Sequence, residues 1–332
     1  MNKNCMSAGS LLLDRRRFLG AGAAAAGLAL GPRQLMAQDT FPSDTIELLV
    51  HAGAGGGTDL TAHALIAGGR SEMDWQMALV RKTGAGGAVS HEYARSRPDD
   101  GHTVLVLTSS QISTIARGAS PLTIEDLAGV GRGTVDPIFL MVGSQSEFQT
   151  AQALLEAGKT RTLTVGLVSI GGGDHITTFL LSGMAGLQTM QAIPIASGGE
   201  VAINLVGGNL DAGMVGISEA DAQIRSGVVR PLINFSEERS EDLPDVPTAR
   251  ELGIDLVRPT LRGFAVLKST PADRLETLRA GFMKAMNAES YQTYLTSSGV
   301  PLSSVADGPT FEEAMRREHD EAKTALTELG LM

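Results

Sequence analysis

The chain has 332 residues, of which 42% are hydrophobic and 19% are charged. This balance predicts a folded protein with one large domain or two ordinary ones, and it excludes an intrinsically disordered chain. The net charge of −10 argues against nucleic acid as a partner.

The first 37 residues have the pattern of an export signal. Residues 14–19 read DRRRFL, which matches the twin-arginine motif, and an apolar run of Ala, Gly and Leu follows over residues 20–30. Eleven residues are too few to cross a bilayer, which takes about 20. We therefore predict a twin-arginine signal peptide over residues 1–37, cleaved after Ala37, and a mature protein in the periplasm.

Removal of this segment changes two properties of the chain. Its five cations and one carboxylate are lost, so the net charge moves from −10 to about −14. Its Cys5 is the single cysteine of the sequence. The mature protein is therefore expected to have neither a disulfide nor thiol chemistry.

After Phe41 the chain alternates apolar, β-branched runs with amphipathic segments, which predicts an α/β fold. The expected strands are Ile46–Val50, Gln76–Arg81, Thr103–Leu107, Ile138–Val142, Leu163–Leu167, Gln191–Pro194, Ala212–Val215, Arg230–Ile233 and Arg262–Leu267. The expected helices are Asp59–Ile66, Ala88–Ser96, Ala151–Glu156, His175–Met184, Glu200–Val206, Glu219–Ser226, Ala272–Met286, Glu289–Ser298 and Phe311–Leu329.

Two glycine-rich turns join a strand to a helix. Residues 50–65 read VHAGAGGGTDLTAHAL, and residues 165–181 read VGLVSIGGGDHITTFLL. Each passes from an apolar strand through three glycines to an acidic residue and a helix. Because they lie about 115 residues apart, we expect one turn in each of two lobes rather than a short repeat.

Bare glycines before a helix allow a ligand to reach the unpaired first amides of that helix, where the macrodipole favours an anion. The alternative for each turn is a tight connection whose polar residues only cap the helix. For Asp59 we favour capping, because a carboxylate there suits the dipole but repels a bound anion. For His175 we favour a structural or ligand-facing hydrogen bond over catalysis.

Motifs for cofactors, metals and catalysis are absent from the sequence. The first glycine turn breaks the dinucleotide fingerprint, it does not run into a G-K-[S/T] phosphate loop, and the six histidines show no metal spacing. No Gly-x-Ser-x-Gly elbow is present, and the best nucleophile–base pair is Ser169 with His175. We therefore expect no cofactor, no metal and no enzymatic activity.

Eight stretches in the same order resemble the substrate-binding proteins of tripartite tricarboxylate transporters, the TctC/Bug group. They are FPS (41–43) with the strand 46–50, GGGTD (55–59), GAGG (84–87), PDDGHT (98–103), SIGGGDH (169–175), SGGE (197–200) with LVGG (205–208), LPDVPT (243–248) and RGF (262–264). The resemblance covers residues 41–332.

The resemblance implies a two-lobed periplasmic-binding-protein fold of type II, with a mixed, mostly parallel sheet in each lobe. Lobe 1 would comprise residues 41–138 plus 263–332 and lobe 2 residues 139–262, with hinge strands near Ile138–Val142 and Arg262–Leu267. The implied function is to bind a small organic anion, a di- or tricarboxylate, and to deliver it as a monomer to inner-membrane transporter subunits. A sensor that passes its ligand to a signalling partner, and a secreted α/β enzyme, are the alternatives.

The ligand-binding residues that the resemblance implies come from both lobes. They are Gly55, Gly56, Gly57, Thr58, Asp59, Thr108, Ser109 and Ser110 in the first lobe, and Ser169, Gly171, Gly172, Gly173, Asp174, His175, Ser197, Gly198, Gly199, Ser218 and Glu219 in the second. The chain departs from the family pattern at His51-Ala52, His63, Gly172 and Ile195-Ala196, where relatives often carry Pro-Phe, Arg, Ser and Tyr-Lys. These departures predict a pocket lined more by backbone than by side chains.

Overall fold

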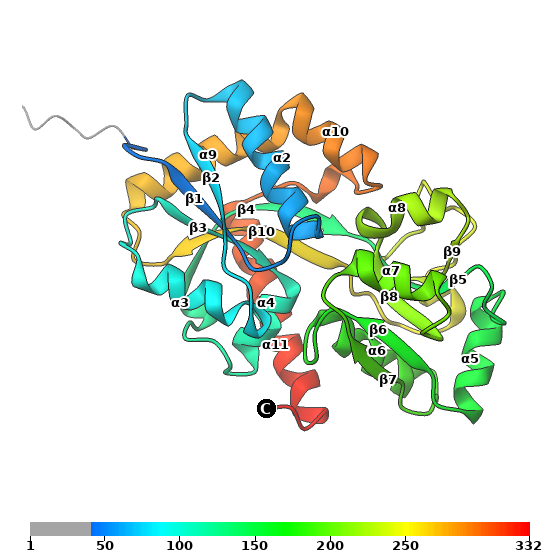
Figure 1. Cartoon of the computed structure of the whole chain (residues 1–332). Coiled ribbons are helices and arrows are strands. Elements are labelled where there is room, and N and C mark those ends of the chain that lie inside the picture. The colour runs from blue at the N-terminus through cyan, green and yellow to red at the C-terminus, as the bar shows by residue number, and fades with distance from the viewer. Residues whose placement is uncertain (1–40) are drawn as a thin grey trace, which may run out of the picture. The chain divides into compact units, whose positions relative to one another are not determined.

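Two mixed β-sheets organise residues 41–332, the part of the chain that the computed structural model describes (Figure 1). The predicted signal peptide and Cys5 lie outside these residues. Each sheet carries helices on its faces, and we call each sheet with its helices a lobe. The fold is the two-lobed α/β arrangement that the sequence predicted.

The first lobe is built on a six-stranded sheet with the order β11-β4-β10-β3-β1-β2. Its strands are β1 (Ile46–Val50), β2 (Met77–Arg81), β3 (Thr103–Thr108), β4 (Leu127–Asp136), β10 (Thr260–Leu267) and β11 (Ala306–Asp307). Its helices are α2 (Gly57–Glu72), α3 (Ala88–Ser96), α4 (Ser109–Ala116), α9 (Ala272–Asn287), α10 (Glu289–Ser297) and α11 (Gly308–Glu328), with 3₁₀ turns η1 (Ala85–Gly87), η2 (Ile124–Asp126) and η4 (Leu302–Ser304).

The second lobe is built on a five-stranded sheet with the order β7-β6-β8-β5-β9. Its strands are β5 (Ile138–Gly143), β6 (Thr164–Leu167), β7 (Gln191–Pro194), β8 (Ala212–Gly216) and β9 (Val229–Asn234). Its helices are α5 (Ala151–Thr160), α6 (Gly173–Met184), α7 (Gly198–Val206) and α8 (Ile217–Arg225), and the 3₁₀ turn η3 (Arg250–Leu252) follows β9.

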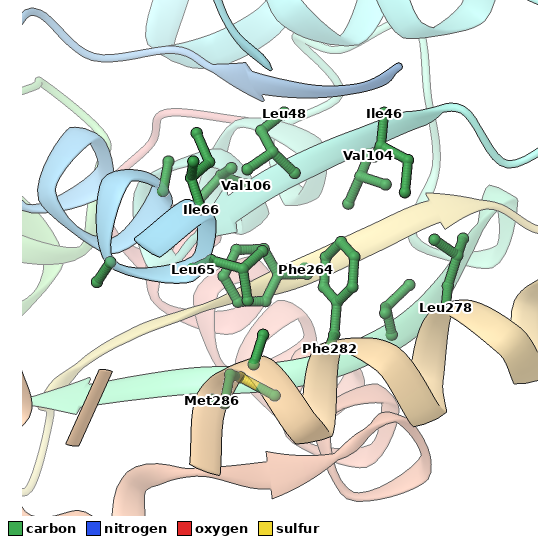
Figure 2. Packing of buried hydrophobic residues seen from close by; sticks show 14 of the residues in the cluster. Ile46, Leu48, Leu65, Ile66, Val104, Val106, Phe264, Leu278, Phe282 and Met286 are labelled. Atoms are coloured by element: carbon green, nitrogen blue, oxygen red, sulfur yellow. The ribbon is translucent and has the colours of Figure 1, made fainter. Parts of the chain in front are cut away.

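Each lobe has its own hydrophobic core. In the first lobe, Leu65 of α2, Phe264 of β10 and Phe282 of α9 meet between the sheet and the helices (Figure 2). The rings of Phe264 and Phe282 pack edge to face, with centroids 5.3 Å apart. Burial of a side chain of this size contributes about 2–3 kcal/mol, so these contacts fix the position of α2 on the sheet.

The chain passes between the two sheets twice. It leaves the first sheet after Asp136 and enters the second at Ile138, with Pro137 between them, and it returns in the stretch between β9 and β10. The C-terminal helix α11 packs on β4 and α4 and also contacts α6 of the second lobe. Two sheet-to-sheet connections and α11 therefore link the lobes.

Both sheets are mixed, as expected, although parallel pairings are not in the majority. Only two of the five strand pairings in the first sheet and two of the four in the second are parallel. The reason lies in the strands beside the crossovers, because β10 runs antiparallel to β3 and β4, and β5 runs antiparallel to β8 and β9.

The sequence prediction also missed β4 and α4. The β4 sequence, LAGVGRGTVD, contains three glycines, which normally weaken a strand. Here each glycine makes room for a neighbouring atom. A Cβ added to Gly129 would lie 2.6 Å from the Gly308 carbonyl oxygen, and one added to Gly131 would lie 2.8 Å from Met286 Cε. A Cβ added to Gly133 would lie 2.6 Å from the Tyr291 hydroxyl. Close packing of the C-terminal helices therefore requires glycine in this strand.

Candidate functional site

The first glycine turn connects β1 to α2. Gly55 has φ of 79°, a left-handed conformation that favours glycine, and Gly56 precedes the first helical residue without a side-chain cap. Asp59 is buried, accepts a hydrogen bond from the Gly55 N–H at 2.9 Å and pairs with Arg81. Asp59 therefore holds the loop rather than capping the helix as expected, and the first amides of α2 have no acceptor from their own turn.

A buried ion pair lies beneath this turn. Arg262 of β10 donates from Nη1 to Asp136 Oδ2 at 2.6 Å, and their side chains are 6% and 0% exposed. A Cβ on Gly57 would overlap the Arg262 guanidinium, so glycine is needed there to let the pair approach the helix. Burial opposes the charge of Arg262, but Asp136 and Glu219 raise its pKa above the usual value.

Asp136 also joins the pair to the second lobe, because its Oδ2 accepts a hydrogen bond from the Ser218 hydroxyl at 2.6 Å. Ser218 is the second residue of α8, whereas Asp136 ends β4 at the crossover to the second sheet. Asp136 Oδ2 thus accepts from Arg262 of the first lobe and from Ser218 of the second, at the point where the chain crosses between the sheets.

Glu219 reaches from the second lobe to the start of α2. Its Oε1 accepts a hydrogen bond from the Gly57 N–H at 3.3 Å. A Cβ on Gly198, the first residue of α7, would overlap the same carboxylate. Burial and Asp136 raise the pKa of Glu219, while Arg262 and the Gly57 amide oppose the rise. A carboxylate therefore lies where the N-termini of α2 and α7 meet.

The second glycine turn has different neighbours. Gly171 has φ of 75°, and its N–H donates to His175 Nδ1 at 3.0 Å. A Cβ on Gly172 would lie 3.3 Å from Ser110 Oγ, and one on Gly173 would lie 3.4 Å from Ser109 Cβ. This turn therefore packs on the start of α4 in the first lobe.

Asp174 connects the second turn to the charged cluster. Burial and the Glu219 carboxylate raise its pKa to about 7, although the Arg262 guanidinium opposes this rise. Among the predicted residues, the structure brings Gly57, Gly198, Ser218 and Glu219 together around the Asp136–Arg262 pair, with Asp174 within electrostatic reach. It brings Ser109 and Ser110 against the second turn instead.

The other predicted residues have structural contacts. Ser197 caps α7, since its hydroxyl accepts from the Glu200 N–H at 3.3 Å, and Gly199 follows in the first turn of that helix. Thr58 and Thr108 are buried at the starts of α2 and α4. Within the described residues no hydrogen bond joins His175 to Ser169. The Nδ1 atom of His175 accepts from the Gly171 amide. Burial and Arg117 also lower the pKa of His175.

Sequence reasoning missed three residues of this region: Asp136, Arg262 as a charged group, and His51. The signal for the ion pair is an arginine within the apolar strand sequence TLRGFAVL, which requires a buried partner. His51 lies close enough to His91 and Arg262 for their charges to act on it, and burial with these two neighbours lowers its pKa to about 3, so it is neutral at physiological pH.

Residues 41–332 contain no cluster of three or more metal-ligating side chains. They also contain no helix that is both long and apolar enough to cross a bilayer.

Comparisons with known proteins identify the family. The family model described as "Tripartite tricarboxylate transporter family receptor" matches residues 65–320. The chain is 30% identical over 299 residues to the UPF0065 protein in the gbd 5′ region of Cupriavidus necator, covering 85% of this chain and 88% of that one. A TctC solute binding protein from Polaromonas, solved without ligand, has 29% identity and a TM-score of 0.70, covering 87% of this chain and 100% of that chain.

A further solved structure shares the fold. MatC from Rhodopseudomonas palustris, solved with bound malate, has a TM-score of 0.78 at 22% identity and covers 86% of this chain and 100% of that chain. The family match, the curated relative and the Polaromonas structure agree with the resemblance seen in the sequence. The chain belongs to the receptor family of tripartite tricarboxylate transporters.

Proposed function

We propose that this protein is a periplasmic solute-binding protein that captures a small organic carboxylate between its lobes and delivers it to a tripartite tricarboxylate-type membrane transporter. The observation that carries the proposal is the meeting of two helix N-termini at one point between the lobes. The Gly57 N–H of α2 donates to the Glu219 carboxylate there, and a Cβ on Gly198 of α7 would overlap the same carboxylate.

The attraction for a ligand carboxylate comes from backbone groups. The first amides of α2 and α7 lack intrahelical acceptors, and each helix end carries about half a positive charge. The mature protein, at about −14, does not attract anions by its overall field. Local helix ends must therefore supply the attraction, as in other anion sites at helix N-termini.

Closure would occur about the two sheet-to-sheet connections. We propose that the lobes rotate near Pro137 and in the stretch between β9 and β10. The predicted lobe boundaries at 138/139 and 262/263 shift slightly, because Ile138 pairs in the second sheet and Arg262 pairs in the first. The Glu219–Gly57 contact joins residues of different lobes and would form only when the second lobe lies against the first. A ligand that also touches both lobes would stabilise this arrangement.

We propose that the ligand-binding residues are those predicted from the sequence, in the glycine turns and at the helix starts of both lobes. Export through the twin-arginine pathway places the mature protein beside its membrane partner. Transport accounts for the family description.

Thermal unfolding with a panel of small carboxylates, malate included, tests the proposal. A ligand at about 100 times its Kd should add about 2.7 kcal/mol to the free energy of unfolding. No stabilisation by any carboxylate would contradict the proposed function.

The variant Gly56→Val locates the site. A Cβ at Gly56 meets only ordinary contacts, at 3.5 and 3.8 Å, and its φ of −76° suits valine, so the protein should fold. The added side chain covers the start of α2 and should weaken carboxylate binding at least about tenfold, or 1.4 kcal/mol. Gly183→Val, at an exposed position of α6 with open space around it, is the matched control and should bind normally.

A further inference from the structure

The position that the proposed function gives to a ligand carboxylate already faces carboxylates of the protein. Glu219 Oε1 accepts from the Gly57 amide at 3.3 Å, although Gly57 and Glu219 belong to different lobes. Asp136 Oδ2 and Glu219 Oε2 both flank Gly216, at 2.9 and 3.4 Å from the position of an added Cβ. Asp174 is near enough to both to feel their charge.

The positive charge available to balance these groups is small. Arg262 is the cation that acts on Asp174 and Glu219, and its guanidinium is already paired with Asp136 at 2.6 Å. His51 is neutral, and the buried Tyr294 phenol keeps its proton because burial raises its pKa. Three carboxylates therefore surround one cation in this part of the structure.

An unused acceptor lies in the same cluster. The Asp136 side chain is fully buried, and within the described residues its Oδ1 has no hydrogen-bond partner. A buried acceptor without a donor is unfavourable, because it has lost its hydrogen bonds to water. The cluster thus has both a surplus of negative charge and an unfilled place for a donor.

We propose that Glu219 is a specificity-determining residue that selects carboxylates bearing an amino group over plain di- and tricarboxylates. The proposal rests on the proposed function, because it concerns the same site. The ligand carboxylate replaces Glu219 as the acceptor for the first amides of α2 and α7, and the ligand ammonium faces Glu219 and its neighbouring carboxylates. A second or third bare carboxylate in that position would meet like charges, and this repulsion would weaken its binding.

The raised pKa values of Asp174 and Glu219 support this assignment, since both groups are more easily protonated where they lie. A ligand ammonium supplies the missing positive charge without requiring a proton from solvent. A plain dicarboxylate instead requires that the cluster take up protons before it binds.

Matched ligand pairs test the proposal by isothermal titration calorimetry at pH 7.5. The pairs are propionate with alanine, succinate with aspartate, and glutarate with glutamate, using both enantiomers of each amino acid. We expect the wild-type protein to bind the amino-bearing member of the best-fitting pair at least about tenfold more tightly. Equal or tighter binding of the plain member would overturn the proposal while leaving the proposed function intact.

The variant Glu219→Gln removes the charge but keeps an oxygen that can accept from the Gly57 amide. The variant should bind the amino-bearing ligand more weakly and the plain ligand more tightly than wild type. The ratio of the two affinities should therefore fall at least about tenfold. An unchanged ratio in a folded variant would also overturn the proposal. Glu200→Gln, an equal charge change at an exposed position in the first turn of α7, should leave the ratio unchanged.

If Glu219→Gln does not fold, Asp174→Asn provides the same test with a smaller expected change, and an unchanged ratio there counts against the proposal. If neither member of any pair binds to wild type, nor any other carboxylate, the proposed function itself fails. The two failures are therefore distinguishable.

Discussion

The two glycine turns start from nearly the same sequence plan and end with different surroundings. Each follows a strand, contains a left-handed glycine and leads into a helix without a side-chain cap. The first turn lies over the buried Arg262–Asp136 pair and contacts Glu219 of the other lobe, whereas the second packs on hydroxyls at the start of α4. The local sequence therefore determines the conformation of each turn, whereas the residues packed against it determine its electrostatic environment.

The largest effect should follow from Asp136→Ala. This change leaves the Arg262 guanidinium buried without its partner, which costs about 3–5 kcal/mol of folding free energy. Urea unfolding measures it. Asp221→Ala, which removes the partner of Arg225 in an exposed pair, is the control and should cost less than about 1 kcal/mol. Similar losses in both variants would contradict the role assigned to the buried pair.

Neighbouring glycines of the first turn should differ in their tolerance of a side chain. Gly57→Ala places a methyl group against the Arg262 guanidinium and should destabilise the fold by about 1–3 kcal/mol. Gly56→Ala meets no close contact and should be neutral or slightly stabilising. Thermal unfolding of the two variants compares them, and equal stability would show that Arg262 does not lie against Gly57 in solution.

Asp174→Asn tests the electrostatic link between the turns. The Asp174 pKa of about 7 exceeds its ordinary value of 3.8, so the folded protein retains a proton that the unfolded chain releases. The contribution of this residue to stability is therefore complete below about pH 4 and is lost as the pH rises through 7. Asparagine cannot ionise, so the variant should be about 1–3 kcal/mol more stable than wild type at pH 8.

This advantage should shrink steadily between pH 8 and pH 5, as measured by urea unfolding at several pH values. A difference that is independent of pH would mean that Asp174 titrates normally and lies outside the charged cluster.

The smallest effect is expected from His175→Ala in the second turn. It removes the acceptor for the partly buried Gly171 amide and should cost about 1 kcal/mol. Because the pKa of His175 is lowered, the cost should be the same at pH 7 and pH 8. A cost that differs between pH 7 and pH 8 would show that the His175 side chain titrates in this range and does not have a lowered pKa.

The elements with strong local patterns were predictable. The strands β1 and β3 are continuous apolar runs, and α11 has a clear amphipathic repeat, so they were placed within a few residues. The strand β4 was not, because its glycines are explained only by helices packed on it from residues more than 150 positions away.

The candidate site was predictable to a similar degree. The sequence indicated the glycine turns and the helix starts, because unpaired amides follow from local geometry. It did not indicate that Asp59 would pair with Arg81, or that Glu219 would reach Gly57 across 162 positions. Such contacts depend on how the two lobes meet, and no local pattern encodes that.

The account depends on a carboxylate ligand at the start of α2, beside Glu219. A ¹H–¹⁵N NMR titration of glycine-labelled protein with its best carboxylate ligand tests this most directly. We predict that the amide resonances of Gly57 and Gly198 shift in proportion to ligand saturation, while that of Gly183 stays in place. Saturation of the protein with unchanged Gly57 and Gly198 resonances would contradict the account.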